Sequence, residues 1–420
     1  MKRKSFGWTL VCVTALTAPA FGQWQGSETV REGVTYVTNT EAPMDVVTLE
    51  PEELWRRGGD DDEVLFGVVS QLVEDKDRNV YLLDGQLSQI QVFSPSGEYL
   101  RSVGREGEGP GEFRNGSDMF LAPGNLLSVV QIFPGKVVQL TLAGDPAGDY
   151  KVPENAGGGF QLIHVGRSNG ERIVLAYAQS RSPDGSGQQS RRQIQTTYLR
   201  AYDAKGNQLA HFYEEEHETV FGGMKFVEEA FSDFARRWAL SQDGRVAAAL
   251  SFNDYRIHVW DPDGSLNRII ERPGFTPVPR DAAAKARFQK FFESITRWNR
   301  GSTFQVSETH STIQGIWFRD DGSLWVMSAA GAWGRDEGTL AQIDVYDEKG
   351  RYAQRIELVC EGDPVEDGLF FAGDRMYRVT DLLSAAMASL GGGTEADVAE
   401  DVEPMSVVAY RLQGPAIGMK

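Results

Sequence analysis

A run of carboxylates is the first feature of the chain whose residue types suggest chemistry. Asp60, Asp61, Asp62 and Glu63 are consecutive, and hard oxygen ligands of this kind can hold calcium. Adjacent carboxylates rarely all point at one ion, and the Asp-x-Asp-x-Asp-Gly spacing with a distal Glu does not occur here. The run is therefore interpreted as a solvated acidic turn, with Asp60, Asp61 and Asp62 as open calcium candidates and no other cofactor expected.

Zinc and nucleophilic chemistry have less support in the sequence. The chain has five histidines, none in an HExxH or HxH pattern, whereas a catalytic zinc needs two or three that converge. No catalytic signature surrounds Cys360, and the sequence gives no support for nucleophilic hydrolysis. No residue is therefore assigned a catalytic role.

A glycine-rich stretch, from Gly104 to Glu112, could suggest phosphate binding, because bare glycine amides can cradle anions. Its spacing does not match the dinucleotide fingerprint, no Lys-Ser/Thr pair follows, and it carries three glutamates. It is interpreted as a connection that needs positive φ angles.

Aromatic and arginine side chains remain as candidates for binding. Trp333 is flanked by Gly331 and Gly334, and Arg335 follows directly. Rings and guanidinium groups often anchor protein interfaces, and planar rings also suit sugars. Packing is an open alternative for Trp333, and Trp298 is interpreted as a packing residue at the end of a helix. The predicted binding residues are Trp333, Arg335, Arg191, Arg192 and Arg105.

A repeated hairpin organises the elements that must position these residues. A short turn opens an apolar strand, another turn follows, and each apolar run is about one strand long. Each unit predicts a four-stranded antiparallel meander, and fixed-period hairpins are typical of a propeller. The inner turn of the six units recurs at Asp77-Arg78-Asn79, Pro123-Gly124-Asn125, Asn169-Gly170, Asp243-Gly244, Asp321-Gly322 and Gly373-Asp374.

The segment from Val80 to Phe113 resembles an NHL-type repeat. It combines a Val-Tyr-Leu-Leu-Asp strand, an Ile-Gln-Val-Phe-Ser-Pro-Ser-Gly turn and a Val-Gly-Arg-Glu-Gly-Glu-Gly-Pro-Gly-Glu-Phe tail. From roughly Gly33 to Leu412 the chain resembles secreted bacterial six-bladed β-propeller proteins. The resemblance implies an all-β fold of six four-stranded antiparallel blades. It implies no reaction for most members, so function is argued separately.

The first 22 residues have the pattern of a signal peptide. Three basic residues precede a weakly apolar stretch from Phe6 to Ala18, and the small residues Ala20 and Gly22 precede a cleavage point before Gln23. The apolar stretch is too short to cross a hydrocarbon core of about 30 Å. We expect export to the periplasm or the cell exterior, with no membrane insertion after cleavage.

Charge and cysteine content limit the partners. The net charge is −18, and such a surface repels nucleic acid and anionic membranes. Cleavage would leave Cys360 as the one cysteine, which excludes an internal disulfide. We expect a monomer that packing and ring closure stabilise.

The predicted domain spans residues 23–412, with a C-terminal tail at 413–420. Ser406 to Leu412 looks like a third strand without a fourth, so we expect the segment before Gly59 to supply the outer strand and close the ring. Helical spacing of apolar residues, with Asp281 as N-cap, predicts one inserted helix at about 281–298, between blades four and five. An Ala-Gly-acidic stretch at about 382–404 is expected to be a mobile low-complexity loop.

Strand parity predicts where function lies. In a meander A-B-C-D, the short A–B and C–D turns share one end, and the B–C loops and D-to-A crossings share the other. Long segments should therefore stand on one rim, where loops on a rigid scaffold concentrate recognition. We expect this rim to bind a protein or peptide, or a carbohydrate; the alternative is a metal-dependent lactonase- or lyase-like enzyme with its site in the central funnel. The four long segments are Gln179 to Gln193, Gly274 to His310, Ala329 to Thr339 and Leu382 to Pro404.

Overall fold

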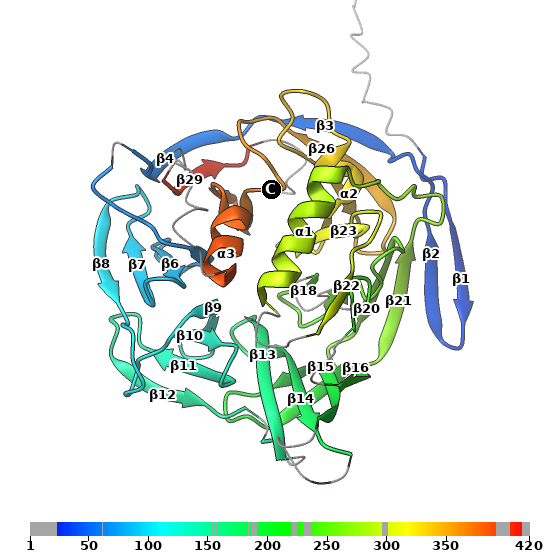
Figure 1. Cartoon of the computed structure of the whole chain (residues 1–420). Helices are drawn as coiled ribbons and strands as arrows, with labels where there is room; N and C mark the ends of the chain where they lie inside the picture. The colour runs from blue at the N-terminus through cyan, green and yellow to red at the C-terminus, as the bar shows by residue number, and fades with distance from the viewer. Residues whose placement is uncertain are drawn as a thin grey trace, which may run out of the picture.

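Six sheets of mainly antiparallel strands stand around a common axis as the blades of a propeller (Figure 1). The structure is a computed structural model, and it describes residues 23–60, 62–152, 154–155, 158–183, 185, 191–220, 225–230, 237–295, 301–391 and 404–413. Blades 1 to 3 consist of β5 (Val69–Glu74), β6 (Val80–Asp84), β7 (Gln89–Phe93) and β8 (Tyr99–Val103); β9 (Gly116–Ala122), β10 (Leu126–Gln131), β11 (Lys136–Leu140) and β12 (Pro146–Tyr150); and β13 (Gly158–Ser168), β14 (Ile173–Arg181), β15 (Arg192–Tyr202) and β16 (Gln208–Val220).

Blades 4 to 6 repeat this order but include strands from the beginning of the chain. β1 (Ser27–Arg31) and β2 (Val34–Thr38) extend blade 4, β3 (Asp45–Leu49) extends blade 5, and β4 (Glu52–Gly58) is the outer strand of blade 6. Their other strands are β18 (Trp238–Leu240), β19 (Val246–Ala248), β20 (Arg256–Trp260) and β21 (Leu266–Glu271); β23 (Ile313–Phe318), β24 (Leu324–Ser328), β25 (Ala341–Tyr346) and β26 (Tyr352–Leu358); and β27 (Gly368–Ala372), β28 (Arg375–Val379) and β29 (Ser406–Arg411).

The hydrophobic core lies between the blades. Middle strands face a neighbouring blade on both sides, so they are largely apolar and buried: all five residues of β6 are buried, whereas the outer strand β8 is mostly exposed. One buried cluster joins Leu83 and Val92 of blade 1 to Met119 and Val129 of blade 2. Five further clusters join the other neighbouring pairs, so packing between blades holds the ring together.

The short turns gather on one face, which we call the turn face. They are stabilised by local hydrogen bonds: the carboxylate of Asp203 accepts hydrogen bonds from the backbone N–H of Lys205 and of Asn207, at 2.8 and 2.9 Å. Gly206 in this turn has φ of 86°, a left-handed conformation that glycine adopts without strain. The Asp-x-x-Gly pattern is therefore explained by the geometry of the turn.

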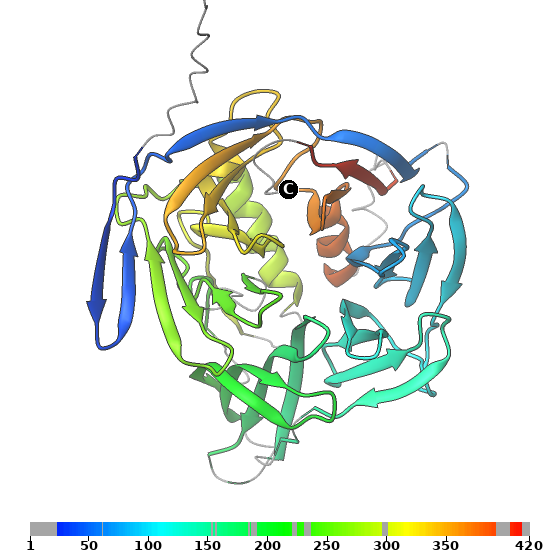
Figure 2. The ribbon, with the colours of Figure 1, turned by 180° about the vertical axis from the view of Figure 1, so that it is seen from behind.

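The opposite face, which we call the loop-rich face, carries the B–C loops and the D-to-A crossings. All four long segments fall at such positions: between β14 and β15, β21 and β23, β24 and β25, and β28 and β29. Two of these segments contain the helices α1 (Ala282–Ile295) and α3 (Leu382–Gly391), which lie in front of the ring in Figure 1 and behind it in Figure 2. On the same face β17 (Lys225–Val227) pairs in parallel with β22 (Thr303–Gln305).

The described residues contain three helices, where the sequence predicted one. α1 (Ala282–Ile295) begins at Asp281, whose carboxylate accepts a hydrogen bond from the N–H of Ala284 at 2.7 Å. Residues 296–298 of the predicted helix, with Trp298, lie outside the described residues. α2 (Ala329–Trp333) starts the segment expected to be a loop.

α3 (Leu382–Gly391) corrects the prediction of a mobile loop at about 382–404. This part of the segment consists almost entirely of Leu, Ala, Met and Ser, and the first three favour helix strongly. Leu382 and Ala385 pack against the cluster between blades 6 and 1, which anchors the helix. Residues 392–403 lie outside the described residues.

Candidate functional site

Trp333 and Arg335 contact other parts of the protein itself. Trp333 ends α2 and stacks on His310, with 3.6 Å between ring centroids, and it packs against the core cluster between blades 5 and 6. Arg335 donates hydrogen bonds to the carbonyl oxygens of Thr339, at 2.9 Å, and Ala332. Both side chains are half-buried and stabilise the segment that carries them.

The other three predicted binding residues lie elsewhere on the ring. Arg192 in β15 forms an exposed ion pair with Glu218 at 2.8 Å, next to the exposed Arg191. Arg105, in the crossing to blade 2, pairs with Glu112 at 2.5 Å. The five predicted residues therefore occupy three separate parts of the ring and do not form one cluster.

The acidic run at the start of blade 1 divides into residues with different roles. Asp62 accepts hydrogen bonds from the N–H groups of Val64 and Gly58, both at 3.1 Å. Burial alone would raise the pKa of Asp62, but these hydrogen bonds and Arg57 outweigh it and lower the pKa. Asp61 lies outside the described residues. Nowhere in the described part of the chain do three His, Cys, Asp or Glu side chains gather closely enough to hold a metal ion.

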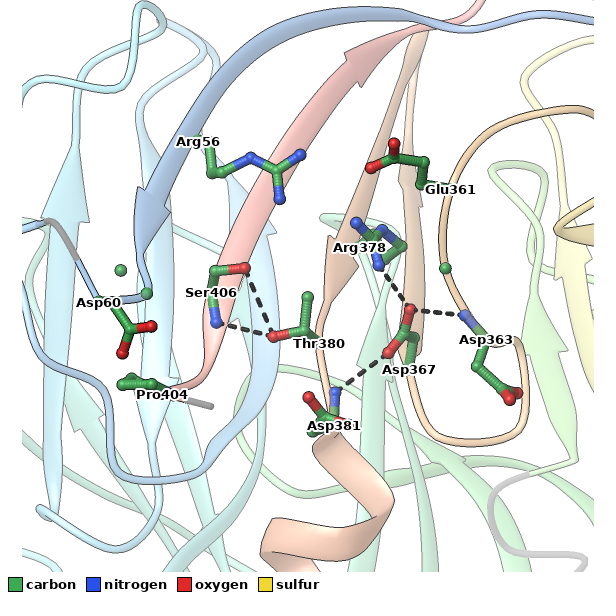
Figure 3. Close-up of a pocket in the computed structure, with 13 residues that line it drawn as sticks. Arg56, Asp60, Glu361, Asp363, Asp367, Arg378, Thr380, Asp381, Pro404 and Ser406 are labelled. Atoms are coloured by element: carbon green, nitrogen blue, oxygen red, sulfur yellow. Dashed lines mark hydrogen bonds and ion pairs between the residues drawn. The ribbon is translucent and has the colours of Figure 1, made fainter. Parts of the chain in front are cut away.

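Asp60 belongs to a pocket of about 520 Å³ on the loop-rich face (Figure 3). The pocket lies where blade 6 meets the crossings that lead into it from blade 5 and out of it to blade 1. It is lined by Arg56, Gly58, Gly59, Asp60, Glu361, Gly362, Asp363, Asp367, Arg378, Thr380, Asp381, Pro404 and Ser406.

A buried ion pair, Asp367 with Arg378, fixes one wall of this pocket. The two side chains are 5% and 7% exposed and 2.8 Å apart. The Asp367 carboxylate also accepts hydrogen bonds from the backbone N–H of Asp363 and of Asp381, both at 3.0 Å. Burial alone would lower the pKa of Arg378, but the interactions with Asp367 and Tyr410 together outweigh it and raise the pKa. One carboxylate thus joins the crossing from blade 5, β28 and the start of α3.

A second set of contacts joins the middle strands of blade 6 at the pocket. The backbone N–H of Ser406 donates a hydrogen bond to the Thr380 hydroxyl at 2.8 Å, and Thr380 N–H donates to the Ser406 carbonyl oxygen at 2.9 Å. Figure 3 shows these two residues between Asp60 and the Asp367–Arg378 pair. Hydrogen bonds therefore hold the backbone of the pocket wall at two places.

The pocket presents negative charge. Five carboxylates line it, at Asp60, Glu361, Asp363, Asp367 and Asp381, against the guanidinium groups of Arg56 and Arg378. Asp60, Glu361 and Asp363 are exposed. The exposed Arg56 already pairs with Glu53 at 2.9 Å. Such a pocket attracts cationic groups and repels anions.

The sequence prediction identified one member of this site, Asp60, and missed the others. The acid-rich crossing from Glu361 to Asp367 could have been predicted as part of the site, because strand parity places every D-to-A crossing on the loop-rich face. Nothing local links Asp367 to Arg378, which lies eleven positions away in a middle strand. That part of the site depends on tertiary structure.

A family model described as a 6-bladed beta-propeller matches residues 60–272. The chain belongs to this family. Among curated proteins none matches it. No helix in the described residues of this propeller is both long and apolar enough to span a membrane.

Solved structures similar to this propeller come from several bacteria. A candidate exported protein of Bacteroides fragilis is 14% identical, with a TM-score of 0.45, over 90% of this chain and 98% of that one. A gluconolactonase of Xanthomonas campestris is 11% identical, with a TM-score of 0.41, over 86% of this chain and 87% of that one. At these values the similarity supports no argument about activity.

Proposed function

We propose that this propeller is an exported binding protein whose loop-rich face recognises a protein or peptide partner. In this proposal the pocket formed by Arg56–Asp60, Glu361–Asp367, Arg378–Asp381 and Pro404–Ser406, called the acidic pocket below, receives a cationic side chain of the partner. The observation that carries the proposal is the location of a pocket with three more negative than positive side chains on the face that bears all four insertions.

The dimensions and rigidity of the acidic pocket support this role. Its volume of about 520 Å³ lies within the range of ligand sites, roughly 300–1,000 Å³. Because Asp367 is held by Arg378 and two backbone N–H groups, the wall does not need to reorganise when a ligand binds. Asp60, Glu361 and Asp363 are exposed to solvent, although Asp363 also accepts a hydrogen bond from the backbone N–H of Val365 at 2.8 Å. Exposed carboxylates can form charge-assisted hydrogen bonds to an incoming lysine or arginine.

A peptide fits this lining better than a carbohydrate does. Sugars are usually recognised by stacking on an aromatic ring as well as by hydrogen bonds, and none of the thirteen residues that line the acidic pocket is aromatic. Charged hydrogen-bond acceptors without a ring suit an amine or a guanidinium group. We therefore place the protein or peptide partner first.

The test compares two short peptides that differ in one charge. The mature chain, residues 23–420, is titrated by calorimetry with a Gly-Ser peptide that carries one central arginine, and with the same peptide carrying citrulline, which has a similar shape and no charge. We expect the arginine peptide to bind at least tenfold more tightly. Equal affinities, or no binding, would overturn the proposal.

A pair of triple variants separates the pocket from overall charge. Asp60→Asn with Glu361→Gln and Asp363→Asn removes three carboxylates from the acidic pocket. The matched control, Asp77→Asn with Glu171→Gln and Glu348→Gln, removes three exposed carboxylates from the turn face. We expect at least a tenfold loss of affinity in the first and less than a twofold change in the second; equal losses would assign the binding to net charge alone.

A further inference from the structure

Three large apolar side chains on the loop-rich face are exposed to solvent. Leu65 is 68% exposed, Leu87 46% and Phe133 66%. Leu65 lies in the crossing from β4 to β5, Leu87 in the B–C loop of blade 1, and Phe133 in the B–C loop of blade 2. We call these three residues the apolar rim. Large apolar side chains exposed on one face cost solubility, and apolar surface of this kind can mark an interaction site.

The loops that carry Leu65 and Leu87 are tied to one carboxylate. Asp84, which is fully buried, accepts hydrogen bonds from the backbone N–H of Gly67 at 2.7 Å, of Val68 at 3.1 Å and of Leu87 at 2.9 Å. The amide of Gln91 also donates to the carbonyl oxygen of Leu65 at 3.1 Å. The two leucines are therefore displayed by loops with fixed backbones.

Phe133 is connected to these loops through the crossing into blade 2. The N–H of Asn115 donates to the hydroxyl of Ser88 at 3.1 Å, and the N–H of Arg114 donates to the Gln131 amide oxygen at 2.9 Å. The Gln131 amide nitrogen in turn donates to the carbonyl oxygen of Pro134 at 3.3 Å. Three buried side chains, those of Asp84, Ser88 and Gln131, thus hold the backbone of the loops that carry the apolar rim.

The apolar rim continues from the acidic pocket along the same face. Asp60 of the pocket and Leu65 of the rim lie five positions apart in one crossing, and Leu87 and Phe133 follow on blades 1 and 2. We infer that the apolar rim docks the part of the partner polypeptide that adjoins its cationic residue. This inference rests on the proposed function, and it names the partner as an extended segment with a basic residue next to bulky apolar residues.

Charge complementarity favours this occupant over a second copy of the chain. The chain carries a net charge of −18, so two copies repel each other, and a basic segment is attracted to the same face. The acidic pocket would fix the basic residue and so the register of the segment. Apolar side chains next to it would then bury Leu65, Leu87 and Phe133 and release ordered water.

The test uses three peptides of equal length in a Gly-Ser background: one with an arginine followed by leucine and phenylalanine, one with the arginine alone, and one with the apolar pair alone. The variant Leu65→Ser with Leu87→Ser and Phe133→Ser is compared with wild type by fluorescence anisotropy. The control, Val46→Ser with Leu100→Ser and Leu209→Ser, changes side chains on outer strands that are 52%, 42% and 48% exposed.

For wild type, we expect the arginine–apolar peptide to bind at least tenfold more tightly than the arginine peptide. In the rim variant this advantage should disappear while the arginine peptide keeps its affinity; the control variant should retain the advantage. Equal binding of the two basic peptides to wild type, or an unchanged advantage in the rim variant, would overturn the inference about the apolar rim. The proposal that the acidic pocket binds a cationic side chain would still stand. If neither basic peptide binds wild type, the proposed function fails and the rim inference fails with it.

Discussion

Three carboxylates on the turn face and three on the loop-rich face show two different ways of finding a partner. On the turn face, Asp75, Asp203 and Asp347 direct their oxygens to N–H groups no more than four positions ahead in the chain. On the loop-rich face, Glu228, Glu366 and Asp367 pair with arginines 52, 79 and 11 positions away. The residue types are similar in the two sets, but the sequence separation between a carboxylate and its partner is much larger on the loop-rich face.

This contrast indicates two structural roles for carboxylates, one in local turns and one in contacts between distant segments. A turn that satisfies its own carboxylate can be repeated around the ring without regard to the rest of the fold. A loop-rich face that depends on pairs between insertions must be assembled by the whole ring, and it holds its other carboxylates in fixed positions for a partner. The loop-rich face should therefore lose more stability than the turn face when a single side chain is removed.

The largest effect is expected from Arg378→Met. This variant leaves Asp367 buried without its cation, and breaking a buried pair in this way costs roughly 3–5 kcal/mol of unfolding free energy. Urea unfolding of the mature chain measures it. The double variant Arg378→Met with Asp367→Leu removes both charges and should recover part of the loss. A single variant within 1 kcal/mol of wild type would contradict the difference between the faces.

The next largest effect is the loss of stability at low pH through His310. His310 is 4% exposed, and its burial, with Arg280 nearby and only Asp281 opposing, lowers its pKa to about 4. In the unfolded chain the pKa is about 6.5, so the unfolded state takes up the proton first. The stabilisation is fully present above pH 6.5 and is lost as pH falls toward 4, up to about 3 kcal/mol. The difference in unfolding free energy between wild type and His310→Gln, followed from pH 7 to 4, isolates this contribution; a constant difference would refute it.

A smaller loss is expected on the turn face from Asp75→Ala. The Asp75 carboxylate, 7% exposed, accepts hydrogen bonds from the N–H groups of Asp77 and Asn79 at 2.9 Å. Loss of such a capping group costs roughly 1–2 kcal/mol. Asp75→Asn keeps an acceptor oxygen and should lose less. Affinity for the arginine peptide should not change in either variant, and a weakened affinity would show that the faces are not independent.

The smallest effect is expected from Arg192→Ala. Arg192 and its partner Glu218 are 62% and 46% exposed, and an exposed pair contributes at most about 1 kcal/mol. Thermal unfolding should shift little, and arginine-peptide binding should stay within twofold. A larger loss of binding would restore Arg192 as a binding residue and move the site toward blade 3.

The fold could be predicted from the sequence because its signal is local and repeated. Turns such as Asp243-Gly244 and Asp321-Gly322 mark each unit, and their parity indicates which face carries the long segments. The acidic pocket could not be predicted, because Asp60, Asp367 and Thr380 come from three separate segments that only the closed ring brings together. The contacts of Trp333 could not be predicted either, because a five-residue helix and a stacking partner leave no clear pattern in the sequence.

The strands at the beginning of the chain constrain the order in which the molecule can fold. β4 pairs with β29, and Glu52 and Arg411, which pair across these strands, are 359 positions apart. Bringing such distant segments together is entropically costly, and contacts of long sequence separation slow folding. Completion of blade 6 is therefore a late event, and until it occurs the edge of β29 is open. Once closed, the ring resists opening, because β2, β3 and β4 must detach from three neighbouring blades before the circle can break.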